Sequence, residues 1–150
     1  MAVLAALRTA STWKAANSAS RPALPFGARA RRRVARRVLF GAAGGAFHGA
    51  RLRGEVVPGG GDWALFGPAG TMRLDVRLTL RTHDDALIRM TYTGRRTAPG
   101  DPAATTESYF RTTPLFETGA GPYTWLNDIV CVGSGYLVDG GVAYRVAQVL

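Results

Sequence analysis

Two aspartates and one arginine are the residues of this sequence that fit acid–base chemistry on a small molecule. Asp62 ends the segment PGGGD, Asp75 lies in LDVRL and Arg111 lies in YFRTT. A carboxylate held beside a small carbonyl or phenolic compound acts as a general acid or base, and nearby donors stabilise the negative charge that develops. We therefore take Asp75, Asp62 and Arg111 as the candidate catalytic residues.

Aromatic side chains and one amide form the second group of candidates. Pockets for small molecules are mostly apolar, with a few placed polar groups that orient the ligand. A tyrosine or an amide in such a pocket also shares with Arg111 the role of stabilising negative charge. The candidate ligand-binding residues are Trp63, Tyr109, Phe116, Trp125 and Asn127.

Each candidate also has a purely structural interpretation. An aspartate after three glycines, such as Asp62, commonly caps a turn. Tryptophan and phenylalanine side chains are more often packed in a core than exposed to a ligand. Asp75 lies among arginines at positions 73, 77 and 81, a pattern typical of ion pairs on a solvated sheet face. Arg111 could be the salt-bridge partner of Asp75.

The elements that position these residues are predicted to be short strands. Residues 72–81, MRLDVRLTLR, alternate aliphatic and charged side chains, which is the period of a half-buried strand. THDD at 82–85 forms the turn of a hairpin, and 86–94 forms its second strand. Further strands are predicted at 50–57, 107–113, 127–135 and 142–149.

The orientation of strand 72–81 decides the role of Asp75. Its aliphatic and charged faces must point to opposite sides of the sheet. If the charged face lines a polar lumen, Asp75 meets Arg111 and Asn127 there and acts as an acid or base. If that face points outward, Asp75 is an ordinary surface residue.

The predicted fold class is all-β, a single antiparallel β-barrel, because six to eight short strands without a long helix close most simply on themselves. The glycine clusters at 41–45 and 58–61 are predicted to be turns and not phosphate-binding loops, since neither opens a helix. The barrel domain is assigned to residues 39–150.

Residues 1–38 are predicted to be a disordered basic leader. Eleven of the 19 basic residues lie in residues 1–54, where there is no acid, while residues 55–150 hold 8 basic and 10 acidic residues, a net charge of −2. The leader is a transit-type peptide, a basic arm or a mis-assigned start. Nucleic acid is therefore not expected to bind the folded domain.

Few features suggest a metal, a membrane or an oxidising compartment. One cysteine, Cys131, and two histidines, His48 and His83, make no recognisable zinc site or disulfide framework. Apolar runs fall short of a membrane span. We expect a cytoplasmic protein without a cofactor, whose partner is a small molecule, and a homo-oligomer is compatible with the sequence.

The order and spacing of several segments resemble a known family. These segments are 44–63, 74–88, 109–118 and 123–127, and the resemblance covers about residues 41–150. The family is domain of unknown function 3237, also called uncharacterised protein family 0311. The resemblance implies a compact antiparallel β-barrel, with members often encoded near small-molecule metabolism.

The chain departs from the family pattern at two places. Family members usually begin with a strand before GG-x-F, and residues 1–33 show no alternating segment, so residues 34–42 form that strand alone or the barrel is incomplete. Asp85 stands where the family is expected to have a glycine, a change that a turn tolerates because aspartate adopts left-handed conformations.

Three functions follow from these observations. The first is a cofactor-independent enzyme in which Asp75 or Asp62 is the acid or base for a small carbonyl or phenolic compound. The second is a binding protein for a small aromatic or acyl ligand, without turnover. The third is an interaction protein that uses the basic residues 1–38.

Overall fold

The computed structural model describes residues 7–17, 36–67, 70–97, 109–139 and 141–150. Eight strands and one 3-10 helix account for most of them. The elements are β1 (Leu7–Asn17), β2 (Arg36–His48), β3 (Arg53–Phe66), β4 (Met72–Thr82), β5 (Leu87–Thr97), β6 (Tyr109–Glu117), η1 (Gly121–Asp128), β7 (Cys131–Val138) and β8 (Gly141–Val149).

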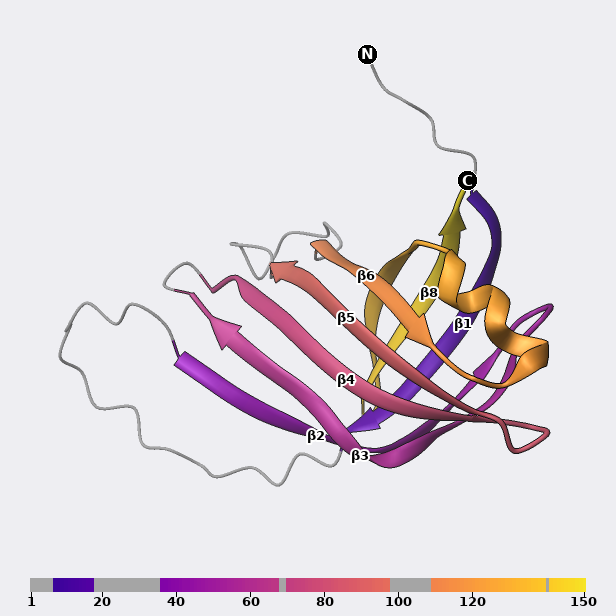
Figure 1. Cartoon of the computed structure of the whole chain (residues 1–150). Helices are drawn as coiled ribbons and strands as arrows, with labels where there is room; N and C mark the ends of the chain where they lie inside the picture. The colour runs from indigo at the N-terminus through magenta and orange to yellow at the C-terminus, as the bar shows by residue number, and fades with distance from the viewer. Residues whose placement is uncertain (1–6, 18–35, 68–69, 98–108, 140) are drawn as a thin grey trace, which may run out of the picture.

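The strands form a closed barrel in which each strand pairs antiparallel with the next along the chain, and β1 pairs with β8. Figure 1 shows this arrangement, with β1 beside β8. The predicted all-β antiparallel barrel is therefore confirmed. Strand ends differ from the predicted ones by a few residues, as in β5, β6 and β8. Residues 98–108, which include the first two residues of the predicted strand 107–113, lie outside the described residues.

β1 lies within the segment that was expected to be a disordered leader. Its residues pair with β2 on one side and with β8 on the other, for example Trp13 with Phe47 and with Tyr144. The expectation of a leader is thus wrong for residues 7–17, because backbone pairing on both edges of a strand does not require an alternating pattern. Residues 1–6 and 18–35 lie outside the described residues.

The β4–β5 hairpin follows the sequence pattern closely. The aliphatic residues of β4 at positions 74, 76, 78 and 80 are buried inside the barrel, and the charged ones between them face outward. Asp85 has a φ of 64°, so it adopts the left-handed conformation expected of it in the turn. β5 runs back beside β4, with Val76 opposite Tyr92.

The two glycine clusters lie inside strands, so their prediction as turns is wrong. The register between β2 and β3 shifts between Gly41 and Gly45, and that between β3 and β4 shifts between Val57 and Gly61. Gly60 has a φ of 73°, which other residues rarely adopt. The clusters are β-bulges that bend long strands around the barrel.

Helix η1 covers one end of the barrel. Tyr123 and Leu126 are buried against the core, and Trp125 packs at its edge. The predicted strand at 127–135 is therefore wrong in its first half, and β7 begins at Cys131. β7 pairs with β6 through only two residue pairs, fewer than any other neighbouring strands in the described barrel. Helix η1 connects these two strands and lies beside this contact.

Candidate functional site

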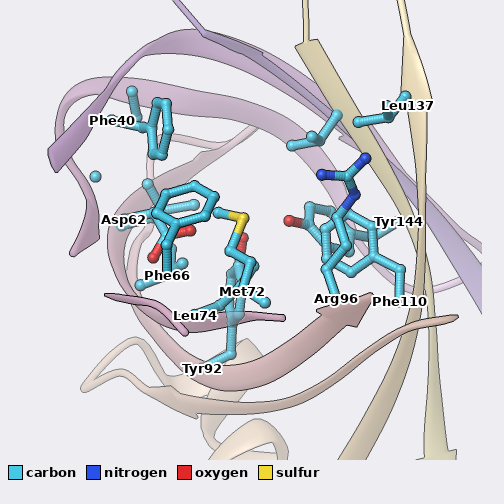
Figure 2. A pocket seen from close by; sticks show the side chains of 15 residues that line it. Phe40, Asp62, Phe66, Met72, Leu74, Tyr92, Arg96, Phe110, Leu137 and Tyr144 are labelled. Atoms are coloured by element: carbon cyan, nitrogen blue, oxygen red, sulfur yellow. The ribbon is translucent and has the colours of Figure 1, made fainter. Parts of the chain in front are cut away.

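The barrel contains a partly open cavity of about 200 Å³ near the end opposite η1. Its described lining comes from strands β2–β8, and most of it is apolar. The principal apolar side chains are Phe40, Phe66, Met72, Leu74, Leu78 and Phe110. Four polar side chains also line the cavity, namely Asp62, Tyr92, Arg96 and Tyr144. Figure 2 shows Asp62 on one side of the cavity, with Arg96 and Tyr144 on the other.

Asp62 projects from β3 into the cavity. The backbone N–H of Asp75 on the neighbouring strand donates a hydrogen bond of 3.0 Å to its Oδ1 atom. Burial raises the pKa of Asp62 above its ordinary value of 3.8, and the hydrogen bond from Asp75 opposes that shift. A carboxyl of this kind is a stronger base than a solvated one, which suits proton transfer.

Tyr92 and Tyr144 form a hydrogen-bonded pair beside Asp62. Their ring centroids lie 5.5 Å apart in an edge-to-face arrangement, and their hydroxyl groups share one hydrogen bond. Burial raises the pKa of both phenols, and the negative charge of Asp62 raises it further. Each phenol has one O–H, and one of the two is used for the hydrogen bond within the pair. The other O–H is therefore available to donate to a ligand.

Arg96 is the cationic side chain among the described residues that line the cavity. Its Nε atom is buried and has no hydrogen-bond partner. Its guanidinium extends toward Tyr144 and Leu137 (Figure 2), and its positive charge lowers the pKa of Tyr144, opposing the effect of burial. Arg96 forms no ion pair with any other described residue.

Asp75 does not face the cavity. Its side chain lies on the outer surface, 41% exposed, and forms an ion pair of 3.3 Å with Arg77. The hypothesis that Asp75 acts in the lumen is therefore wrong, because the aliphatic face of β4 fills the interior. Its backbone still contributes to the site through the hydrogen bond to Asp62.

Arg111 and Tyr109 also lie on the outer surface of the barrel. Arg111 Nη1 donates to Ser134 Oγ at 2.9 Å and its guanidinium stacks over the Tyr109 ring. In the register of the sheet Arg73 lies opposite Arg95, and Arg95 lies opposite Arg111. We call these three residues the arginine row; none of them pairs with an acidic residue within the described part of the chain.

The remaining predicted residues are not part of the described cavity lining either. Trp63 lies on the outer face of β3 under the guanidinium of Arg77. Phe116 is buried in the core, while Trp125 on η1 stacks with Arg51. Asn127 bonds both the backbone N–H and the carbonyl of Thr118, so its amide holds a loop. Of the eight predicted site residues, Asp62 alone is among the described residues that line the cavity.

The described ranges contain neither a metal-binding group of side chains nor a membrane-spanning helix. No group of three or more His, Cys, Asp or Glu side chains in these ranges could hold a metal ion. No helix in the same ranges is both long and apolar enough to cross a bilayer.

A family model described as "protein of unknown function (DUF3237)" matches residues 7–149. The chain belongs to this family. The match begins where β1 begins, which agrees with the place of that strand in the barrel. A UPF0311 protein of Rhodopseudomonas palustris is 33% identical over 116 residues, covering 71% of this chain and 76% of the relative. A UPF0311 protein of Clostridium acetobutylicum is 34% identical over 112 residues, covering 67% and 71%.

Crystal structures of similar proteins share the fold of this DUF3237 member. A β-barrel-like protein from Acinetobacter baumannii is 26% identical, with a TM-score of 0.83, covering 100% of this chain and 99% of its own. A conserved protein of unknown function from Rhodopseudomonas palustris is 28% identical, with a TM-score of 0.82, covering 99% and 100%. An enzyme from Penicillium herquei has the same fold at 21% identity and a TM-score of 0.72, covering 100% and 98%.

Tyr92, Tyr144 and Arg96 are the polar cavity residues that sequence reasoning missed. A usable signal was present for two of them. Tyr92 and Arg96 occupy the same alternate positions of β5 as the buried Ile88 and Met90, so the period of two assigns them to the inner face. Arg96 was missed because the predicted strand ended at residue 94, whereas β5 continues to Thr97.

Proposed function

We propose that this DUF3237 protein is a cofactor-independent enzyme in which Asp62 transfers a proton to or from a small carbonyl or phenolic compound. The observation that carries the proposal is the position of Asp62. It is a carboxyl with a raised pKa, inside a mostly apolar cavity and beside two phenols. Catalytic acids and bases are commonly prepared by burial of this kind.

The geometry supports one sequence of events for a ketone. The Asp62 carboxylate accepts a proton from the carbon next to the carbonyl, and the electron pair of that C–H bond forms an enolate. The O–H that remains on the Tyr92–Tyr144 pair donates to the enolate oxygen, and the hydrogen bond within the pair strengthens that donation. Return of the proton from Asp62 to carbon completes the cycle without any cofactor.

A binding protein for a small aromatic or acyl ligand is the alternative, and the apolar lining of the cavity favours it. Apolar pockets bind flat ligands without any chemical step. The Penicillium herquei enzyme shares the fold alone at 21% identity, so it does not decide between the two functions for this chain.

Deuterium exchange tests the proposal directly. The protein is incubated in D₂O with a panel of small aromatic ketones, and the loss of the protons next to the carbonyl is followed by NMR. We expect exchange with wild-type protein and with Asp75→Asn, and exchange about 10²-fold or more slower with Asp62→Asn. A ketone that binds wild-type protein without accelerated exchange would favour the binding protein.

A further inference from the structure

We infer that the cavity takes a small aromatic carboxylate, with the anionic group bound by Arg96. This inference rests on the proposed function, because it names the substrate class for the same cavity. It adds a second polar anchor, on the opposite side of the cavity from Asp62, to the site described above.

The charge of Arg96 is the first observation. Its Nε atom is buried without a partner, and the guanidinium forms no ion pair with any described residue. A cation in a mostly apolar cavity is costly unless an anion compensates it. A carboxylate on a ligand would compensate this charge, because it matches the paired N–H groups of a guanidinium.

The position of Arg96 along β5 is the second observation. Tyr92 lies level with Asp62 in the sheet, since Val76 pairs with both. The main chain of Arg96 lies four residues further along β5, roughly 13 Å at the usual rise of a strand, and its guanidinium extends into the cavity toward Tyr144. Leu74 pairs with Gly94 and so lies between these two levels, while Phe110 pairs with Arg96 and adds an apolar ring at its level. A ligand that fits must be polar at both ends and apolar in the middle.

The volume of the cavity limits the size of that ligand. An apolar cavity of roughly 150 Å³ holds benzene, and pockets for drug-sized ligands begin at roughly 300 Å³. A cavity of about 200 Å³ thus suits one substituted aromatic ring. Arg96 supplies one positive charge, which matches a monoanionic carboxylate better than a phosphate dianion.

Matched pairs of ligands test the inference by isothermal titration calorimetry. Each pair is a single-ring aromatic carboxylate and its neutral amide, for example 4-acetylbenzoate and 4-acetylbenzamide, which have nearly the same shape. With wild-type protein we expect at least one carboxylate of the series to bind about tenfold or more tightly than its amide. No carboxylate preference in any pair would overturn the inference.

Variants assign the preference to Arg96. We expect Arg96→Gln to lose it, Arg96→Lys to keep part of it, and Arg95→Gln to keep it in full, because Arg95 is the next residue on β5 but faces outward. Thermal unfolding confirms that each variant is folded. A preference that survives in folded Arg96→Gln would contradict the inference.

Asp62→Asn separates this inference from the proposed function. We expect it to abolish exchange of the acetyl protons of 4-acetylbenzoate while leaving the carboxylate preference intact. Wild-type protein that prefers carboxylates but shows no exchange would refute the enzyme and support the anion site. Exchange without a carboxylate preference would support the enzyme and refute the anion site.

Discussion

The main chain of Asp75 holds the side chain of Asp62, through a hydrogen bond of 3.0 Å from the backbone N–H to Oδ1. The two aspartates of the sequence motifs therefore have different roles. One carboxyl lies in the cavity, and the other forms a surface ion pair with Arg77. Because the bond comes from the backbone, replacing the Asp75 side chain leaves it in place.

The pH dependence of stability should identify Asp62. Burial raises its pKa in the folded barrel, so folding favours the protonated form. The stability that protonation contributes is complete below the ordinary value of 3.8 and is lost as the pH rises through the raised pKa. We therefore expect Asp62→Asn to gain stability relative to wild type between acidic and neutral pH, as measured by thermal unfolding. Asp75→Asn is the control, and an equal gain there would contradict this account.

The tyrosine pair should limit stability at alkaline pH. Burial raises the pKa of Tyr92 and Tyr144, so both phenols stay protonated in the folded barrel above their ordinary value of 10.0. Unfolding frees them to ionise, and stability should fall as the pH rises above that value. Tyr92→Phe and Tyr144→Phe should each reduce this fall, while costing about 0.5–1.5 kcal/mol at neutral pH for the lost hydrogen bond. The absorbance of the tyrosinate ion measures how many tyrosines have ionised at each pH. Ionisation of all five tyrosines before the barrel unfolds would contradict the role of the tyrosine pair.

The arginine row should make the barrel sensitive to salt. Like charges directly opposite each other in a sheet are destabilising. Arg95 lies between Arg73 and Arg111, so Arg95→Glu should replace two repulsions by two attractions and stabilise the barrel by about 0.5–1 kcal/mol at low salt. The gain should shrink as salt screens the charges. Arg145→Glu is the comparison variant, and equal gains from both would argue against the row as the cause.

β1 should be required for a stable monomer. A chain that begins at Arg36 lacks the strand that joins β2 to β8, which leaves two sheet edges unpaired. We expect its unfolding midpoint to fall by roughly 10 °C or more, since 1 kcal/mol corresponds to roughly 2–4 °C at this size. Size-exclusion chromatography should also show association through the edges. Removal of residues 1–6 alone is the control, and a monomeric truncated chain with an unchanged midpoint would contradict the role of β1.

The barrel and the β4–β5 hairpin could be predicted from the sequence, because apolar residues at every second position indicate a strand with one buried face. β4 shows this, as its aliphatic residues fill the interior. β1 was missed because its place depends on backbone pairing with two distant strands. The glycine clusters of β2 and β3 were predicted as turns because glycine is common both in turns and in β-bulges.

The candidate site was harder to predict because motif membership does not say which way a side chain points. Asp62 and Trp63 are neighbours in one motif, yet the pleat sends one into the cavity and the other to the surface. Asn127 bonds a loop backbone, which its place after Trp125 could not reveal. Tyr144 meets Tyr92 only because barrel closure brings β8 across from β5.

The pairing of Leu7 with Val149 has a consequence for how the protein is made. The contact that closes the barrel joins residues from nearly opposite ends of the chain, and contacts of such high sequence separation form slowly. During synthesis β1 leaves the ribosome early and must wait until β8 has been made. Until then β1 has one unpaired edge, which is a place where another chain could pair and start aggregation.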